Sequence, residues 1–246
     1  MKQIKKRIFA GAVCDQIVYL VGENVKDPKK AKARQRFKNE QERAEHNRLV
    51  SRRKHARLIN NCFKPGDLYG TLTLDDEHEV HSFDEARRIR DNYFRRLTYA
   101  CPESIIFIYM GRGKSTNRIH FHIICSSDVP KELIAAKWNM GKVTHVRELR
   151  EHNYYQGKDC GQDYTGLANY LFDHWTEEQG GHRYKYTRKT AKQPEAEEPT
   201  ECRREYRPDR PPIPPKGYML TWVEHNKYGY MCFHFVKKSG KVRKVE

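Results

Sequence analysis

Two histidines one residue apart, His120 and His122, are the residues in this chain best suited to chemistry. They lie in an apolar run that favours a β-strand, where successive side chains point to opposite faces. Both imidazoles should therefore share one face, roughly 6.5 to 7 Å apart at their Cα atoms, while Phe121 points into a core. Two imidazoles on one face can converge on a divalent metal ion. The alternative, two ordinary strand residues, is not excluded by the pair alone.

The neighbouring segments predict the elements that must position this pair. Ser82, with Glu85 three residues later, has the pattern of a helix start, and apolar residues then recur at helical spacing. The expected order is a strand at 67–74, a helix at 83–99, a strand at 105–110, a basic turn at 111–114, the histidine strand, a short helix at 130–138, a strand at 142–147 and a helix at 163–176. This order indicates an α+β fold, an antiparallel sheet with helices packed on its faces.

The regions outside this core have a different composition. Residues 1–62 are expected to form a strand or hairpin and a basic helical arm, 63–189 the core, 190–216 an irregular Pro-rich and charged connector, and 217–246 a C-terminal β-hairpin packing on the core. Between residues 26 and 57, thirteen are Lys or Arg and few are apolar. That segment predicts a helix with almost no buried face, either merely solvated or contacting phosphates.

The charge of the chain indicates a polyanionic partner. Its 246 residues carry a formal net charge of +16, and 37% of them are hydrophobic. One core of ordinary size is therefore expected, with nucleic acid favoured over an acidic membrane as partner. A basic protein without any chemistry is the alternative.

Cysteine spacing and hydropathy indicate the compartment. The seven cysteines are scattered without a C-x-x-C pair, which favours reduced thiols in a cytoplasm. No run of about 18 apolar residues predicts a membrane span, and the N-terminus does not have the pattern of a signal peptide.

Three motifs in order resemble the HUH endonucleases. They are the strand GTLTL at 70–74, the pair His120 and His122 on a later strand, and a tyrosine, Tyr170, in the helical segment GLANYLFD at 166–173. The chain is similar to single-tyrosine rolling-circle replication initiators of bacterial phages, plasmids and integrative elements. The resemblance covers roughly residues 68–189, and the order of the three motifs is more specific than the histidine pair.

The resemblance implies a nicking reaction on single-stranded DNA at a replication origin. Tyr170 would attack a phosphodiester, leaving a 5′-phosphotyrosine link and a free 3′-hydroxyl, while His120 and His122 hold Mg²⁺ or Mn²⁺. A polymerase would extend the free 3′-hydroxyl, and a helicase would be a further partner, because no Walker-type phosphate-binding loop is present to drive unwinding. A conjugative relaxase has the same chemistry. A non-catalytic single-stranded DNA-binding protein and a metal-dependent hydrolase with a water nucleophile are further alternatives.

Two departures from the family pattern concern the site. Relatives usually have a lysine three residues after the tyrosine, where this chain has Asp173, so Lys185 or Lys189 would have to replace it. If the helix register differs instead, the nucleophile would be another tyrosine: Tyr154, Tyr155, Tyr164 or Tyr184.

Many relatives also have a carboxylate ligand near the position of Met110 and Gly111. The third ligand or an outer partner would here be Asp173, His174, Asp76 or Asp75. The residues expected to contact DNA are Arg112, Lys114, Arg118, Lys185, Lys189, Arg52, Arg53 and Lys54.

Overall fold

A computed structural model describes residues 1–30, 37–113, 116–174 and 184–238. The chain divides into two compact units, each built from stretches that are separate in sequence. The terminal unit comprises Met1–Asn61, His152–Tyr164 and Gln193–Glu246, and the histidine unit comprises Cys62–Glu151 and Thr165–Lys192. The predicted segments 1–62, 190–216 and 217–246 thus fall almost entirely in one unit, together with a stretch that was expected in the core.

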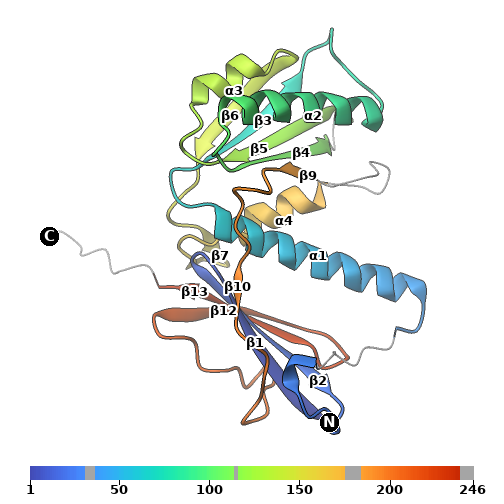
Figure 1. Ribbon diagram of the computed structural model, residues 1–246, viewed down its shortest axis with the longest axis vertical. Coiled ribbons are helices and arrows are strands. Elements are labelled where there is room, and N and C mark those ends of the chain that lie inside the picture. Colours follow the sequence, from blue (N-terminus) through green and yellow to red (C-terminus); the bar gives the residue numbers. More distant parts are fainter. Residues whose placement is uncertain (31–36, 114–115, 175–183, 239–246) are drawn as a thin grey trace, which may run out of the picture. The chain divides into compact units, whose positions relative to one another are not determined.

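The histidine unit is a five-stranded antiparallel sheet with three helices (Figure 1). Its strand order is β6-β3-β5-β4-β9, so the histidine strand β5 is central. The strands are β3 Leu68–Leu74, β4 Ile106–Arg112, β5 Ile119–Cys125, β6 Gly141–Glu148 and β9 Tyr184–Tyr186; the helices are α2 Phe83–Ala100, α3 Lys131–Lys137 and α4 Thr165–Asp173. The predicted α+β class is confirmed.

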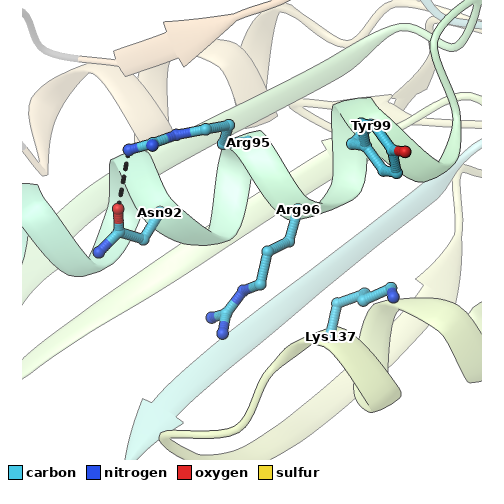
Figure 2. Close-up of a pocket in the computed structure, with 5 residues that line it drawn as sticks. All are labelled: Asn92, Arg95, Arg96, Tyr99 and Lys137. Carbon is cyan, nitrogen blue, oxygen red and sulfur yellow. Dashed lines mark hydrogen bonds between the residues drawn. The ribbon is translucent and has the colours of Figure 1, made fainter.

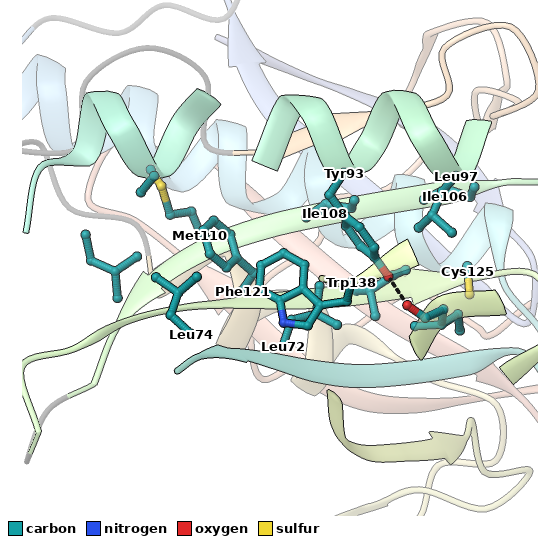
Figure 3. Close-up of a cluster of buried hydrophobic side chains, with 14 of the residues drawn as sticks. Leu72, Leu74, Tyr93, Leu97, Ile106, Ile108, Met110, Phe121, Cys125 and Trp138 are labelled. Carbon is teal, nitrogen blue, oxygen red and sulfur yellow. Dashed lines mark hydrogen bonds between the residues drawn. The ribbon is translucent and has the colours of Figure 1, made fainter. Parts of the chain in front are cut away.

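One face of this sheet packs on α2 and α3 through apolar side chains (Figure 3). Phe121, fully buried, lies 5.4 Å from the Trp138 ring, and Tyr93 on α2 donates a hydrogen bond of 2.9 Å to the Ile134 carbonyl of α3. Each large apolar side chain buried here contributes about 1.5–3 kcal/mol. Ser82 caps α2 by accepting from the Asp84 amide.

The other face of the sheet carries the histidines and a row of aromatic rings. Because side chains alternate, His120 and His122 point away from Phe121. Tyr109 is the cross-strand partner of His122 and is fully buried. Its ring lies 5.4 Å from Tyr184, and the row continues in Phe107 and Tyr186, 4.8 Å apart.

The terminal unit is a second antiparallel sheet that joins both ends of the chain. Its order is β10-β1-β2-β13-β12, with β11 also paired to β1. The strands are β1 Lys2–Ala10, β2 Val13–Val21, β10 Glu195–Ala196, β11 Thr200–Glu201, β12 Tyr218–His225 and β13 Met231–Lys237, with a separate hairpin of β7 Tyr154–Tyr155 and β8 Lys158–Asp159 and a 3-10 turn η1 Pro28–Lys30.

The connector differs from the prediction, and the partner of the C-terminal hairpin was not predicted. The hairpin forms as expected, and its strand β13 pairs with β2 in the sheet of the terminal unit. The connector contributes β10 and β11, because β1 has an open edge whose backbone groups need partners.

The basic helix α1, Glu40–Cys62, starts later than predicted and has a buried end. Residues 55–60 are buried, since apolar side chains at Leu58 and Ile59 follow the charged run and give this part of the helix a face to pack. Arg57 is buried with them. In the described ranges, no helix is long and apolar enough to cross a membrane.

Three buried charges and the partly buried Asp163 hold α1 in the terminal unit. Asp15 on β2 accepts from His234 Nδ1 at 2.6 Å and from Arg57 Nε at 2.5 Å, and His234 Nε2 lies 3.0 Å from Asp163. The positive charges of Arg57 and His234 are equal in number to the negative charges of Asp15 and Asp163. Their attraction offsets part of the free-energy cost of removing these groups from water. Burial opposes ionisation of both groups, but His234 and Arg57 hold the pKa of Asp15 at about 2, and Asp15 and Asp163 raise the pKa of His234 to about 9.

We expect the terminal unit to be most stable between about pH 4 and pH 6.5. The raised pKa of His234 stabilises the unit fully below its ordinary value of 6.5, and that contribution is lost as the pH rises to about 9. The lowered pKa of Asp15 stabilises it above 3.8, and that contribution is lost as the pH falls to about 2. Urea unfolding across the pH range, followed by fluorescence of Trp222, which stacks on His234, measures this. His234→Gln should remove the loss of stability above pH 6.5. If that variant loses the same stability between pH 6.5 and about 9, His234 is not its cause.

Candidate metal centre and nucleophile

His120 and His122 bring two ring nitrogens together on β5. Their Nε2 atoms lie 3.1 Å apart. Two adjacent ligands of an ion with metal–nitrogen bonds of ~2.1 Å are ~3.0–3.4 Å apart, so the spacing fits shared coordination. The predicted convergence of this pair is present in the structure.

His174, immediately after α4, adds a third imidazole to the pair. Its Nδ1 hydrogen-bonds the Tyr170 carbonyl at 2.9 Å, which turns the lone pair of Nε2 outward. One ligand atom from each of the three histidines lies within 4.8 Å of the others, so the cluster could hold a metal ion.

Gly111 on β4 provides the space that His174 occupies. A Cβ atom at this position would lie 2.9 Å from His174 Cδ2 and 3.4 Å from His120 Nε2. Gly111 is also the cross-strand partner of His120. A side chain is therefore absent at the position where the resemblance would place a carboxylate, and an imidazole that follows α4 fills the same volume.

Two hydroxyl groups from β3 fix the ring of His122. Tyr69 Oη lies 3.0 Å and Thr71 Oγ1 3.2 Å from His122 Nδ1. Such partners orient a metal-binding imidazole and fix which nitrogen carries the proton. Sequence reasoning missed both residues. Their alternation on the predicted strand placed them on one face, but only the register of β3 against β5 shows which histidine they contact.

The histidines of β5 are neutral at physiological pH. Burial and then the neighbouring His120 and His174 lower the pKa of His122 to about 3. Burial also lowers the pKa of His120, against a hydrogen bond to the Arg118 backbone. Neutral imidazole is the form that binds metal, so no proton has to be displaced from these two residues at pH 7.

Tyr170 lies beside the cluster with its ring partly in solvent. Its side chain is 47% exposed, and its ring centroid is 4.1 Å from His174 and 5.6 Å from His122. Burial raises the pKa of Tyr170, and a hydrogen bond from Tyr69 opposes the rise. The phenol is therefore protonated at neutral pH and accessible to a large substrate.

The other candidate ligands lie elsewhere. Asp173 is exposed and is not part of the three-histidine cluster. Asp76 forms an ion pair with Arg118 at 2.9 Å, and Asp75 accepts from His78. Among the residues that the structure places, His174 is the candidate that joins the pair.

The other candidate tyrosines have different surroundings. Tyr164 is buried in the terminal unit, Tyr154 and Tyr155 are exposed on β7 of that unit, and Tyr184 belongs to the aromatic row.

The basic residues expected to contact DNA have varied surroundings. In the histidine unit, the Arg112 guanidinium covers the Phe83 ring at 4.7 Å, Lys185 lies 3.6 Å from Asp91, and Lys189 is exposed. Lys114 lies outside the described residues.

On α1, only part of the basic run is open to solvent. Arg53 donates to Glu224 at 2.9 Å and covers the Tyr230 ring, Arg52 is half-buried, and Lys54 is exposed.

No protein-family model, curated protein or solved structure matches the chain significantly.

Replacing His174 should weaken metal binding while replacing Asp173 should not. His174→Ala removes one of three imidazole ligands, and we expect Mn²⁺ affinity to fall at least about tenfold. Asp173→Asn, the matched control on the adjacent residue, removes a charge outside the cluster. Isothermal titration calorimetry with Mn²⁺ measures both, and equal affinities for His174→Ala and the unaltered protein would exclude His174 as a ligand.

Gly111→Ala should weaken metal binding mainly through His174. The added methyl group meets the His174 ring at 2.9 Å and has to displace it, whereas its contact with His120 Nε2 is longer, at 3.4 Å. Most of the affinity loss should therefore disappear in a His174→Ala background, where both changes act on the same ligand. Fully additive losses in the double variant, measured by the same calorimetry, would show that Gly111 acts chiefly on another ligand.

Proposed function

We propose that this protein is a metal-dependent DNA-nicking and strand-joining endonuclease with Tyr170 as its nucleophile. The observation that carries the proposal is the shared helical turn of Tyr170 and His174. One turn at the end of α4 supplies both a third imidazole and an accessible phenol beside it. A histidine cluster for a purely structural ion would not require an exposed tyrosine against its rings.

The residues fit transesterification of a phosphodiester. Tyr170 Oη forms the new bond to phosphorus as its proton leaves, and the bond from phosphorus to the 3′ oxygen breaks, with that oxygen taking up a proton. A metal held by the three histidines would polarise a non-bridging oxygen. Tyr69 stabilises the developing phenolate through the hydrogen bond that already opposes the raised pKa of Tyr170. Since a phenol has a pKa of about 10, the link is reversible and the strand can be rejoined.

Three imidazoles favour Mn²⁺ over Mg²⁺ as the ion. Mg²⁺ prefers an octahedral shell of oxygen ligands and retains waters, whereas imidazole suits transition metals. Neither the cluster nor its hydroxyl partners supply a carboxylate.

The substrate we propose is single-stranded DNA at a replication origin, and the role is initiation of rolling-circle replication in a bacterial cytoplasm. A net charge of +16 supports a nucleic-acid substrate. The free 3′-hydroxyl would prime a polymerase, and a helicase would unwind the template. A conjugative relaxase would use the same residues on a transfer origin.

Tyr170→Phe should abolish the covalent product while leaving the fold intact. The substitution keeps the ring against His174 and removes only the reacting hydroxyl. A labelled single-stranded DNA with Mn²⁺, resolved on a denaturing gel, reports a protein-bound DNA band. We expect the band with the unaltered protein and none with the variant.

Tyr184→Phe is the matched control, since it removes a hydroxyl from the same unit, from a ring that packs on Tyr109 and Phe107. It should keep the covalent band. A band that persists in Tyr170→Phe would exclude Tyr170, and peptide mapping would then identify the tyrosine that carries the nucleotide. Cleavage without any covalent band would instead indicate a water nucleophile.

A further inference from the structure

A hollow of about 470 Å³ lies in the histidine unit, lined by α2 and α3 (Figure 2). Four of its residues belong to α2, and Lys137 reaches it from the end of α3. These helices cover the sheet face that carries Phe121, which is the face opposite the three histidines. The hollow is therefore separate from the candidate metal centre. Its lining residues are Asn92, Arg95, Arg96, Tyr99 and Lys137.

The lining of this hollow is cationic and contains no carboxylate. Arg95, Arg96 and Lys137 contribute three positive charges, and Asn92 is the remaining polar residue. Arg95 donates to the Asn92 side chain at 2.9 Å, an amide that does not neutralise it.

Arg96 lines this hollow without an acidic partner. Its Nε atom is buried and has no hydrogen-bond partner among the described residues, and the same is true of Arg87 Nε. A buried, unpaired guanidinium donor is costly, about 1–3 kcal/mol or more. Earlier on the same helix, however, Arg87 forms an ion pair with Asp84, and Arg90 forms one with Asp91. The guanidinium of Arg96 has no such ion pair among the described residues, and an anionic ligand in the hollow would supply it.

Tyr99 adds an aromatic surface beside these cations. Its side chain is 91% exposed at the C-terminal end of α2, so it contributes almost nothing to the core. A tyrosine ring exposed beside arginine and lysine side chains suits a nucleobase whose phosphate contacts the cations.

We propose that this hollow binds one nucleotide of a single-stranded nucleic acid, with the phosphate at Arg96 and Lys137 and the base stacked on Tyr99. Stacking on a single tyrosine ring gives a free nucleotide little affinity, whereas a strand adds phosphate contacts along the cationic helix. The site would hold a strand on the sheet face opposite the metal centre. The proposal goes beyond nicking and does not require it.

Binding in EDTA tests this site separately from cleavage. A fluorescein-labelled 12-nucleotide oligothymidine and the full chain are measured by fluorescence anisotropy at several salt concentrations. Tyr99→Ala should weaken binding about fivefold or more through lost stacking. Arg96→Gln and Lys137→Gln should each reduce the slope of log affinity against log salt by about one.

Arg88→Gln is the matched control, because Arg88 is exposed on the same helix but does not line the hollow. A pocket effect requires that the three pocket variants lose clearly more affinity than this control. Photocrosslinking of an iodouracil-substituted oligonucleotide should also label the peptide that contains Tyr99. Thermal unfolding confirms that each variant is folded, and Lys137→Gln and Tyr99→Ala carry the test if Arg96→Gln is not folded.

Two results would overturn the proposal. If the three pocket variants lose no more affinity for the oligonucleotide than Arg88→Gln does, the binding reflects the general positive charge of the protein and not this site. If adenosine monophosphate or inorganic phosphate displaces the labelled oligonucleotide as well as unlabelled oligonucleotide does, the hollow binds a free ligand and not a strand. If the protein binds the strand at this hollow but does not nick DNA, the binding site is supported and the proposed nicking reaction is excluded.

Discussion

The pairing of β5 between β3 and β4 is the constraint on which the candidate metal centre depends. In this register His122 lies opposite Thr71 on one side and Tyr109 on the other, and His120 lies opposite Gly111. A shift of one residue would send both imidazoles into the apolar core, because strand side chains alternate with period two. The core of Phe121 against α2 and α3 fixes that register, so the packing on one face specifies the chemistry on the other.

The site is completed by a helix that is distant in sequence. α4 brings His174 over the open position at Gly111, and the hydrogen bond from His174 Nδ1 to the Tyr170 carbonyl ties the third imidazole to the proposed nucleophile. Tyr69 connects the same groups from the sheet side, since its hydroxyl contacts both His122 and Tyr170. The candidate metal centre and the proposed nucleophile are thus supported by the same few contacts, and a displacement of α4 would disturb both.

The positively charged side chains of this protein have two kinds of surroundings. In the terminal unit Arg57 and His234 are buried, and two carboxylates balance them. These charges serve the fold, because each is held by partners on other segments of the chain. Around the hollow of α2 and α3, Arg96 and Lys137 have no carboxylate beside them among the lining residues. Charges of the first kind stabilise the protein, and charges of the second kind are available to a polyanion.

The sequence by itself determined the elements of the histidine unit other than β9, and the direction of its two histidines, because local periodicity decides which face of a strand a side chain occupies. Only the tertiary structure decided the third imidazole, since His174 and Gly111 are far apart in sequence and their fit depends on where α4 packs. The same holds for Arg57, whose basic surroundings predicted an exposed arm. Its partner Asp15 lies on a strand whose contact with α1 no local pattern shows. Long-range pairing likewise joined the C-terminal hairpin to β2, because an open strand edge accepts any segment with a matching pattern of exposed backbone groups.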